Sequence, residues 1–292
     1  MKIYIKILIV LISSLIFFSC QKEDVYNPKK RLLSIFDYQQ SVKTPFVSFI
    51  YDKNEKIEKA VFFDNSSFHF EYNEDHQVTK ILGFSNNLPY GFVIMEYIDK
   101  KLSKCSYFNN SNVIFQMDTF YRQDGMIYGY KSYIAPLGKE MLTDQINSRL
   151  FQSYMHAHAY KNIHKILDDI KSGMALVSHT NVTYKDKNIT QLETVYNNGF
   201  TTLYKFNYDT KENPLYGLPY ALIDYLKFPS SPLTSYCKNN FIFSSYTEHY
   251  GTPGVGLEVH YDIVYENKKY PIQIYTNIGN ETTIRWEFNY LK

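Results

Sequence analysis

The sequence predicts a mainly β fold: one large, curled antiparallel meander of hairpin repeats, with a helical insert near residues 143–171. Two observations carry this prediction. Tyr and Phe are unusually frequent, at 29 and 21 of 292 residues, and both residue types favour strands. A unit that alternates apolar and polar residues and ends in Tyr also recurs along the chain, which is typical of a repeated strand.

The repeat unit is an aromatic strand ending in Tyr, a short polar turn, an aliphatic residue and a Lys. Tyr51, Tyr72 and Tyr97 occupy the same position in three successive copies. These copies read FVSFIYDKNEKIEK (46–59), SFHFEYNEDHQVTK (67–80) and GFVIMEYIDKKLSK (91–104). Weaker copies cover residues 118–130, 180–196, 203–220, 263–275 and 285–292.

Each unit is expected to form a β-hairpin. Residues 68–72 alternate aromatic and polar side chains, which is the period of a strand with one buried face. Asp124-Gly125 and Asn198-Gly199 are two-residue hairpin signals, because both dipeptides favour positive φ. A long meander must curl or close to bury its apolar face, and we expect a curled one.

The strand pattern breaks at residues 139–173. Apolar residues recur there at helical spacing, and Gly173 stands where a helix commonly ends, so one or two helices are predicted over 143–171. We expect them to cover a face or an edge of the sheet. A two-layer arrangement with the helices on the concave face is the alternative.

The N-terminus has the composition of a signal peptide. Lys2 and Lys6 precede an apolar run from Ile7 to Phe18, which is shorter than the roughly 20 residues of a membrane span. Residues 1–19 are therefore predicted to be removed, the alternative being a retained anchor helix. Without Lys2 and Lys6 the chain has 29 basic and 29 acidic residues, which gives no electrostatic reason to expect nucleic acid as a partner.

The residues around Ser19-Cys20 resemble the lipobox of bacterial lipoproteins, in the relaxed form of Bacteroidetes because Phe17 replaces the usual aliphatic residue. The resemblance implies that Cys20 is lipidated and anchors the protein to the outer membrane. Lys22, Glu23 and Asp24 are similar to the export signal of surface lipoproteins of that phylum, with periplasmic retention as the alternative. We assign 20–44 to the lipidated N-terminus and tether, and 45–292 to the β domain.

The hairpin units resemble the YD repeats of RHS proteins. Tyr51-Asp52 and Tyr208-Asp209 carry the dipeptide, whereas Tyr72-Asn73 and Tyr184-Lys185 depart from it. The chain as a whole is similar to a Bacteroidetes lipoprotein family of unknown function that combines a lipobox with such repeats and a terminal aromatic strand, here 285–292. The resemblance implies an architecture and no catalytic residues.

The sequence provides no convincing catalytic or metal-binding set, and no cofactor is predicted. His156, His158 and His164 would point in different directions on one helix, so they are not expected to share a metal ion. Cys105 and Cys237 are expected to be two separately buried thiols, the alternative being a disulfide. His249 is a weak candidate partner for a nucleophilic Cys237.

These observations favour a non-enzymatic binding or scaffold module for a glycan, a peptide or a partner protein. The exposed face of the strands is the expected contact surface, because an exposed aromatic platform can bind sugar rings or peptide side chains. The alternative is a hydrolase whose site is assembled from scattered Asp, Glu and His residues.

Overall fold

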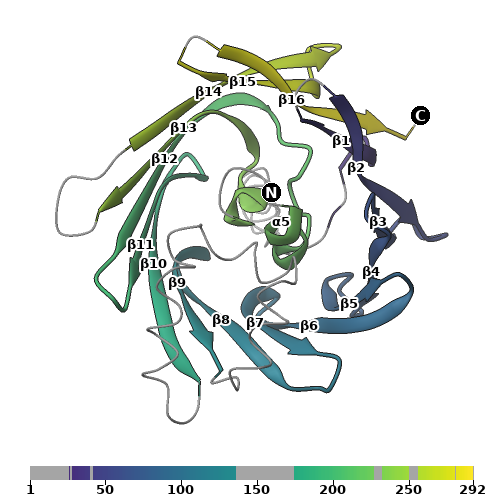
Figure 1. Ribbon diagram of the computed structural model, residues 1–292, viewed down its shortest axis with the longest axis vertical. Coiled ribbons are helices and arrows are strands. Elements are labelled where there is room, and N and C mark those ends of the chain that lie inside the picture. The colour runs from purple at the N-terminus through teal and green to yellow at the C-terminus, as the bar shows by residue number, and fades with distance from the viewer. Residues whose placement is uncertain are drawn as a thin grey trace, which may run out of the picture.

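The computed structural model describes residues 26, 28–39, 42–135, 174–226, 232–249, 256–279 and 281–291. Its sixteen strands form one closed antiparallel barrel in which each strand pairs with its neighbours in sequence and β16 pairs with β1 (Figure 1). The strands are β1 Leu32–Gln39, β2 Val42–Tyr51, β3 Ile57–Phe62, β4 Ser66–Tyr72, β5 Val78–Ser85, β6 Leu88–Ile98, β7 Lys101–Asn109, β8 Ile114–Gln123, β9 Met126–Ile134, β10 Ala175–Lys185, β11 Asn188–Tyr196, β12 Thr201–Glu212, β13 Asn239–His249, β14 Gly256–Glu266, β15 Tyr270–Ile278 and β16 Glu281–Tyr290.

The closed barrel corrects the predicted fold class, a curled meander with a helical insert. The two ends of the sheet join through a register that runs from Leu32 opposite Tyr290 to Asp37 opposite Trp286. β1 lies within the stretch 20–44 that the sequence assigns to the tether, and it supplies the pairing that closes the sheet. The prediction of a mainly β structure is confirmed, but the prediction of an open, curled sheet is wrong because the sheet closes on itself.

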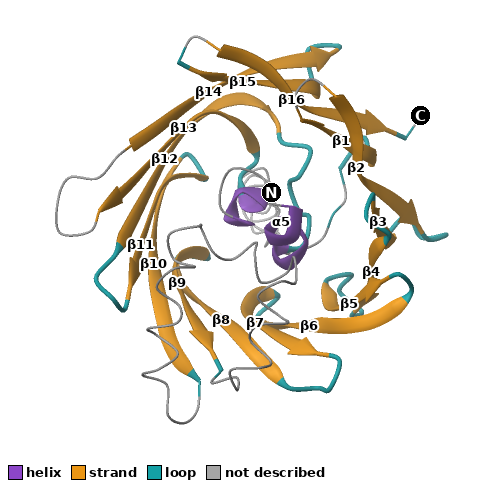
Figure 2. Ribbon diagram, in the orientation of Figure 1, coloured by secondary structure: helices purple, strands orange, loops and turns teal. Residues whose placement is uncertain are grey.

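The predicted helical insert at 143–171 lies outside the described residues. The helix that the structure does describe is α5, Tyr220–Leu226, which is followed by the 3₁₀ helix η1, Pro232–Tyr236. Both lie at the centre of the barrel, surrounded by the strands (Figure 2). No helix among the described residues is long and apolar enough to span a bilayer.

The two ends of the barrel differ in what they carry. The terminal rim holds the beginning of β1, the end of β16, both connections to the central helices, and the turns at 52–56, 73–77, 99–100, 124–125, 186–187 and 267–269. The opposite rim holds the turns at 63–65, 86–87, 110–113 and 197–200. Both chain ends and the central helices therefore enter the barrel from the terminal rim.

At four places on the terminal rim a strand-terminal Tyr has the same structural role. Its hydroxyl donates a hydrogen bond to a backbone carbonyl near the start of the neighbouring strand, a contact that we call the tyrosine latch. Four latches have O–O distances of 2.6 or 2.7 Å: Tyr51 to Leu32, Tyr72 to Ile57, Tyr97 to Val78 and Tyr290 to Pro271. In the β7–β8 pair Arg122 takes this place, and its guanidinium donates to the Leu102 carbonyl at 3.0 Å.

A β-bulge accompanies the repeated Tyr in each hairpin of this rim. The register shifts at Tyr51, Tyr72 and Tyr97, so one extra residue follows the first residue of the next strand. In two hairpins this residue is Thr79 or Ser103, whose hydroxyl donates to a carbonyl of the partner strand. Bulges bend a strand and increase its twist, and their repetition around one rim gives the sheet the curvature that closure needs.

The aliphatic residue of the repeat is the first or second residue of the next strand and faces the barrel interior. Ile57, Val78, Leu102, Ile127 and Ile189 occupy this position and are all buried. They join one apolar core with the inward aromatic residues and with α5 and η1. Repeat Tyr, bulge and buried aliphatic residue thus form one unit that attaches each hairpin to the core.

The predicted turn at Asp124-Gly125 has positive φ at both residues, 53° and 78°, as the two-residue hairpin requires. At Asn198-Gly199 only Gly199 has positive φ, and the Gly199 amide donates to the Tyr196 carbonyl at 2.9 Å. This second turn is therefore longer than the sequence predicts.

A conservative test of the latch is Tyr72→Phe, which removes the hydroxyl and keeps the ring. We expect a loss of about 1 kcal/mol of unfolding free energy, the usual worth of one hydrogen bond, plus the cost of an unsatisfied Ile57 carbonyl. Chemical denaturation of the mature chain measures it. Tyr128→Phe is the matched control because Tyr128 is 47% exposed and points outward. Equal stability of the two variants would contradict a structural role for the latch.

Candidate functional site

Several residues singled out in the sequence lie outside the described part of the chain. They are Cys20, Lys22, Glu23 and Asp24 of the N-terminus, and His156, His158 and His164 of the predicted insert. Within the described residues, no group of three or more His, Cys, Asp or Glu is placed to hold a metal ion.

The two remaining cysteines are separate, buried thiols without a disulfide. The Cys237 sulfur lies 3.3 Å from both the Tyr208 hydroxyl and the Ile189 amide nitrogen. Burial raises the pKa of the Cys237 thiol to about 11, so it stays protonated and is a poor nucleophile. His249 stands at the far end of β13, an eleven-residue strand about 36 Å long, and cannot act as a base for Cys237.

The barrel interior contains one strongly perturbed carboxyl group, that of Asp118 on β8. It has no solvent exposure, and the Ser132 hydroxyl donates to its Oδ1 at 2.6 Å. Burial raises the pKa of Asp118 to about 6, an effect that hydrogen bonds with Ser132, Gln116, Tyr107 and Tyr220 partly oppose. Because Tyr220 begins α5, this group joins the central helix to the wall.

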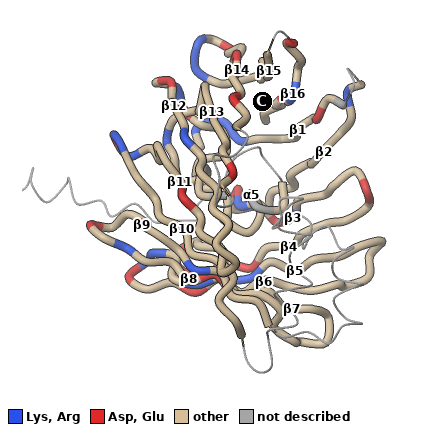
Figure 3. The backbone as a smooth tube through the Cα atoms, turned by 60° about the vertical axis from the view of Figure 1, so that its left-hand side comes forward, with Lys and Arg blue, Asp and Glu red and all other residues tan. Residues whose placement is uncertain are grey.

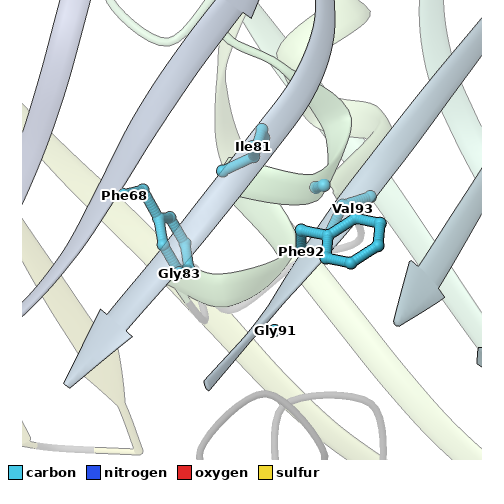
Figure 4. Close-up of a pocket in the computed structure, with 7 residues that line it drawn as sticks. Phe68, Ile81, Gly83, Gly91, Phe92 and Val93 are labelled. Atoms are coloured by element: carbon cyan, nitrogen blue, oxygen red, sulfur yellow. The ribbon is translucent and has the colours of Figure 1, made fainter. Parts of the chain in front are cut away.

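The interior leaves little room for a ligand beside α5. Figure 4 shows an apolar cavity between the helix and the wall, lined by Phe68, Ile81 and Val93 among others. Its volume of about 10 Å³ is close to what a single water molecule needs. The apolar lining also offers no group to fix a polar substrate, so this part of the interior is packing rather than a binding chamber.

The outer wall carries a cluster of aromatic and aliphatic side chains on neighbouring strands. They alternate with core residues and therefore point outward, and each is partly exposed. We call this cluster the wall patch: Leu82 and Phe84 of β5, Phe92 and Ile94 of β6, Phe108 of β7 and Ile114 of β8.

Cross-strand register brings these side chains into one continuous surface. Leu82 lies opposite Phe92, Phe92 opposite Phe108, and Phe108 opposite Ile114. The rings of Phe92 and Phe108 stack with centroids 4.7 Å apart and an interplanar angle of 9°. At the edge of the patch, on β4, His69 packs against Phe84. With strands about 4.8 Å apart, the surface extends roughly 20 Å around the wall.

Charged pairs border the wall patch on the side of the terminal rim. Lys104 and Glu96 form an ion pair with an N–O distance of 2.6 Å, and Lys80 lies 3.9 Å from Glu71. The Lys80 ammonium also lies 5.0 Å from the centre of the Phe92 ring. On the opposite rim, the exposed turn residues Leu88 and Val113 follow the same strands. The patch is an apolar surface with a polar border on one side, as in protein–protein interfaces.

Other parts of the outer wall mix polar side chains with apolar ones such as Phe243 and Val264. On β11 to β14 the outward positions include Gln191, Glu193, Lys205, Glu258 and Asp262. Figure 3 shows acidic and basic residues distributed along the strands and turns of the wall. Barrels that span a bilayer have an apolar outer band and a polar interior. Here the described interior packs an apolar core around α5 and η1, and the described outer wall has an apolar surface over part of its circumference.

No protein-family model matches the chain, and no curated protein matches it. Among solved structures, a porin-like protein from Bacteroides vulgatus ATCC 8482 is similar over 90% of this chain and 99% of that chain, with 10% sequence identity and a TM-score of 0.53. A porin-like protein from Bacteroides uniformis ATCC 8492 covers the same shares with 8% identity and a TM-score of 0.36. At such identity the first likeness shows a shared barrel fold.

The pH dependence of stability tests the role of Asp118. Folding raises the pKa of Asp118, so the contribution of this group to stability is fully present below the ordinary carboxyl pKa near 4, is lost as pH rises from about 4 to about 6, and is constant above that range. Asp118→Asn should remove this loss, a relative gain of about 3 kcal/mol between pH 4 and pH 7. Unfolding free energies of both proteins across this range measure it.

Asp99→Asn is the matched control for this measurement, because Asp99 lies in an exposed turn at the terminal rim. This variant should keep the pH profile of the natural chain. If Asp118→Asn also kept that profile, the pKa of the Asp118 carboxyl would have to be the same in the folded and the unfolded chain, which would contradict the predicted shift.

Proposed function

We propose that this protein is an outer-membrane lipoprotein, held by lipidated Cys20, that binds a partner protein through the wall patch. The observation that carries the proposal is the continuous aromatic and aliphatic surface centred on the stacked Phe92 and Phe108 rings. Apolar surfaces of this kind on otherwise polar proteins mark interaction sites. The porin-like barrel fold is in keeping with a non-enzymatic role at the outer membrane.

The composition of the wall patch favours a protein over a glycan. A sugar site needs hydrogen-bonding groups beside the aromatic ring to recognise hydroxyl groups. Here Leu82, Ile94 and Ile114 surround the two stacked rings, and the nearest charged groups are already paired with one another. An apolar protein surface complements this arrangement better than a polyhydroxylated ligand does.

A lipid anchor fits the polarity of the barrel. An outer wall that carries charged residues among its apolar ones, around a core packed on α5 and η1, differs from the apolar outer band and polar interior of a bilayer-spanning barrel. The Ser19-Cys20 lipobox, the YD-like hairpins and the terminal aromatic strand together support the resemblance to the Bacteroidetes lipoprotein family. By the same resemblance, Lys22, Glu23 and Asp24 would direct the protein to the cell surface.

The hydrolase alternative has less support. The strongly perturbed carboxyl Asp118 has no solvent exposure and faces Ser132 and the tyrosines around α5. A general acid must reach the substrate atom that it protonates. Asp118 is better explained as part of the attachment of the central helix.

The anchor is tested by Cys20→Ala. This variant should lose acyl labelling and leave the membrane fraction, because the thioether bond forms on the Cys20 sulfur. A triple substitution of Lys22, Glu23 and Asp24 by Ala should keep acyl labelling but protect the protein from protease added to intact cells. Membrane association of Cys20→Ala, or unchanged protease sensitivity of the triple variant, would refute the respective assignment.

Partner binding is tested by photo-crosslinking in cells, with a photoreactive amino acid at position 92 and, as a matched control, at position 243. Phe243 also points outward but lies on β13, on another part of the wall. We expect protein adducts at position 92 only. With the partner identified and purified, Phe92→Asp should weaken binding at least tenfold, and Phe243→Asp should leave it unchanged.

Adducts at position 243 alone, or equal loss of binding in both Asp variants, would place the interface elsewhere. Saturable binding on a glycan array that is lost in Phe92→Asp would show instead that the patch recognises sugars. A hydrolase screen on the same protein tests the enzymatic alternative, which turnover lost in a single Asp, Glu or His variant would support.

A further inference from the structure

We infer that the terminal rim of the barrel faces the membrane and contacts an anionic lipid surface. This inference rests on the proposed lipidation of Cys20. It goes further than that proposal because it fixes the orientation of the barrel, which lipidation alone leaves open. Three independent features of the described residues support it: the place where the chain enters, the charge of the rim and the residues at its turns.

The chain enters the barrel at the terminal rim and is held there. The Leu32 amide donates to the Tyr26 hydroxyl at 3.2 Å, and the Tyr26 side chain packs against the core. Lys30 forms an ion pair with Glu266 and lies 5.2 Å from the centre of the Tyr290 ring. Arg31 pairs with Glu55 in the turn after β2 at 2.6 Å. These contacts fix the positions of Tyr26, Lys30 and Arg31 relative to the rim.

Tyr26 lies only six positions after Cys20 in the chain. Even a fully extended chain of that length spans about 20 Å. The wall is taller: an eleven-residue strand such as β6, tilted by about 40°, rises about 28 Å along the barrel axis. A lipid on Cys20 therefore keeps the membrane close to the terminal rim and out of reach of the opposite rim.

The charge of the terminal rim complements an anionic lipid surface. Residues 29–31, 52–56, 73–77, 99–101, 122–126, 185–187 and 266–269 contain twelve Lys or Arg and eight Asp or Glu. The described turns of the opposite rim at 63–65, 86–87, 110–113 and 197–200 contain Asp64 and no Lys or Arg. A basic residue near an anionic membrane contributes about 1 kcal/mol of attraction.

Two turns of the terminal rim combine exposed apolar residues with basic ones. Ile98, which is 67% exposed, precedes Lys100 and Lys101 in the turn between β6 and β7. Met126, which is 40% exposed, follows Arg122 in the turn between β8 and β9. An exposed apolar tip of this kind suits the interface of the headgroup region, and the positive charge beside it favours anionic headgroups, although Lys100 pairs with Asp75 and Arg122 donates to the Leu102 carbonyl.

The orientation is tested with the full lipidated chain in vesicles of phosphatidylcholine and phosphatidylglycerol that contain a nitroxide-labelled headgroup lipid. A fluorophore is attached to Met126→Cys at the terminal rim or, as matched control, to Val113→Cys at the opposite rim. Val113 is 42% exposed, which is close to Met126. Cys105 and Cys237 are fully buried, so labelling is confined to the introduced thiol, and the unsubstituted chain controls for background.

We expect severalfold stronger quenching at position 126 than at position 113. Equal quenching at both positions, or stronger quenching at 113, would overturn the orientation while leaving the lipid anchor intact. Flotation of the same vesicles separates the two claims: a chain that does not float with the lipid refutes the anchor itself, and the orientation with it.

Discussion

The barrel depends on one repeated contact, the hydrogen bond from a Tyr hydroxyl to the backbone at the start of the neighbouring strand. The bulge beside each latch bends the sheet, and the latch holds the bent hairpin against the next aliphatic residue of the core. A single hairpin of this kind would be marginal in water. Repetition around the rim makes the curvature add up until β16 meets β1, and closure removes both edges of the sheet.

Closure also determines where function can reside. Sixteen strands enclose more space than their own side chains fill, and the chain supplies α5 and η1 to occupy it. The part of the interior beside α5 serves packing and helix attachment. Asp118 is buried there with its polar neighbours, and the cavity next to the helix is small and apolar. The proposed recognition surfaces accordingly lie on the outer wall and the terminal rim.

The repeat could be recognised from the sequence because each of its residues is required by the local geometry of one hairpin. Tyr72 at a strand end, a polar turn and Val78 at the next strand start recur wherever the same hairpin forms. Closure could not be recognised in this way, because it depends on the summed curvature of all hairpins and on the pairing of Leu32 with Tyr290, far apart in the chain. α5 was missed for a related reason: Tyr220–Leu226 has seven residues, of which a single one, Asp224, is charged, and this segment is too short for helical periodicity to give a signal.

The wall patch could not be predicted from the sequence either. Alternation predicts that Phe92 and Val93 point to opposite faces, but it does not tell which face is buried. Nor does it reveal that Phe92 and Phe108 stack, because that depends on the register of two strands with different turns. Once the structure shows that Val93 faces the core, the alternation places the Phe92 ring on the outer face of the wall. Burial cannot account for the two stacked rings there, and this distinguishes them from Tyr51, Tyr72 and Tyr97, whose hydroxyl groups form latches and whose rings pack against the core.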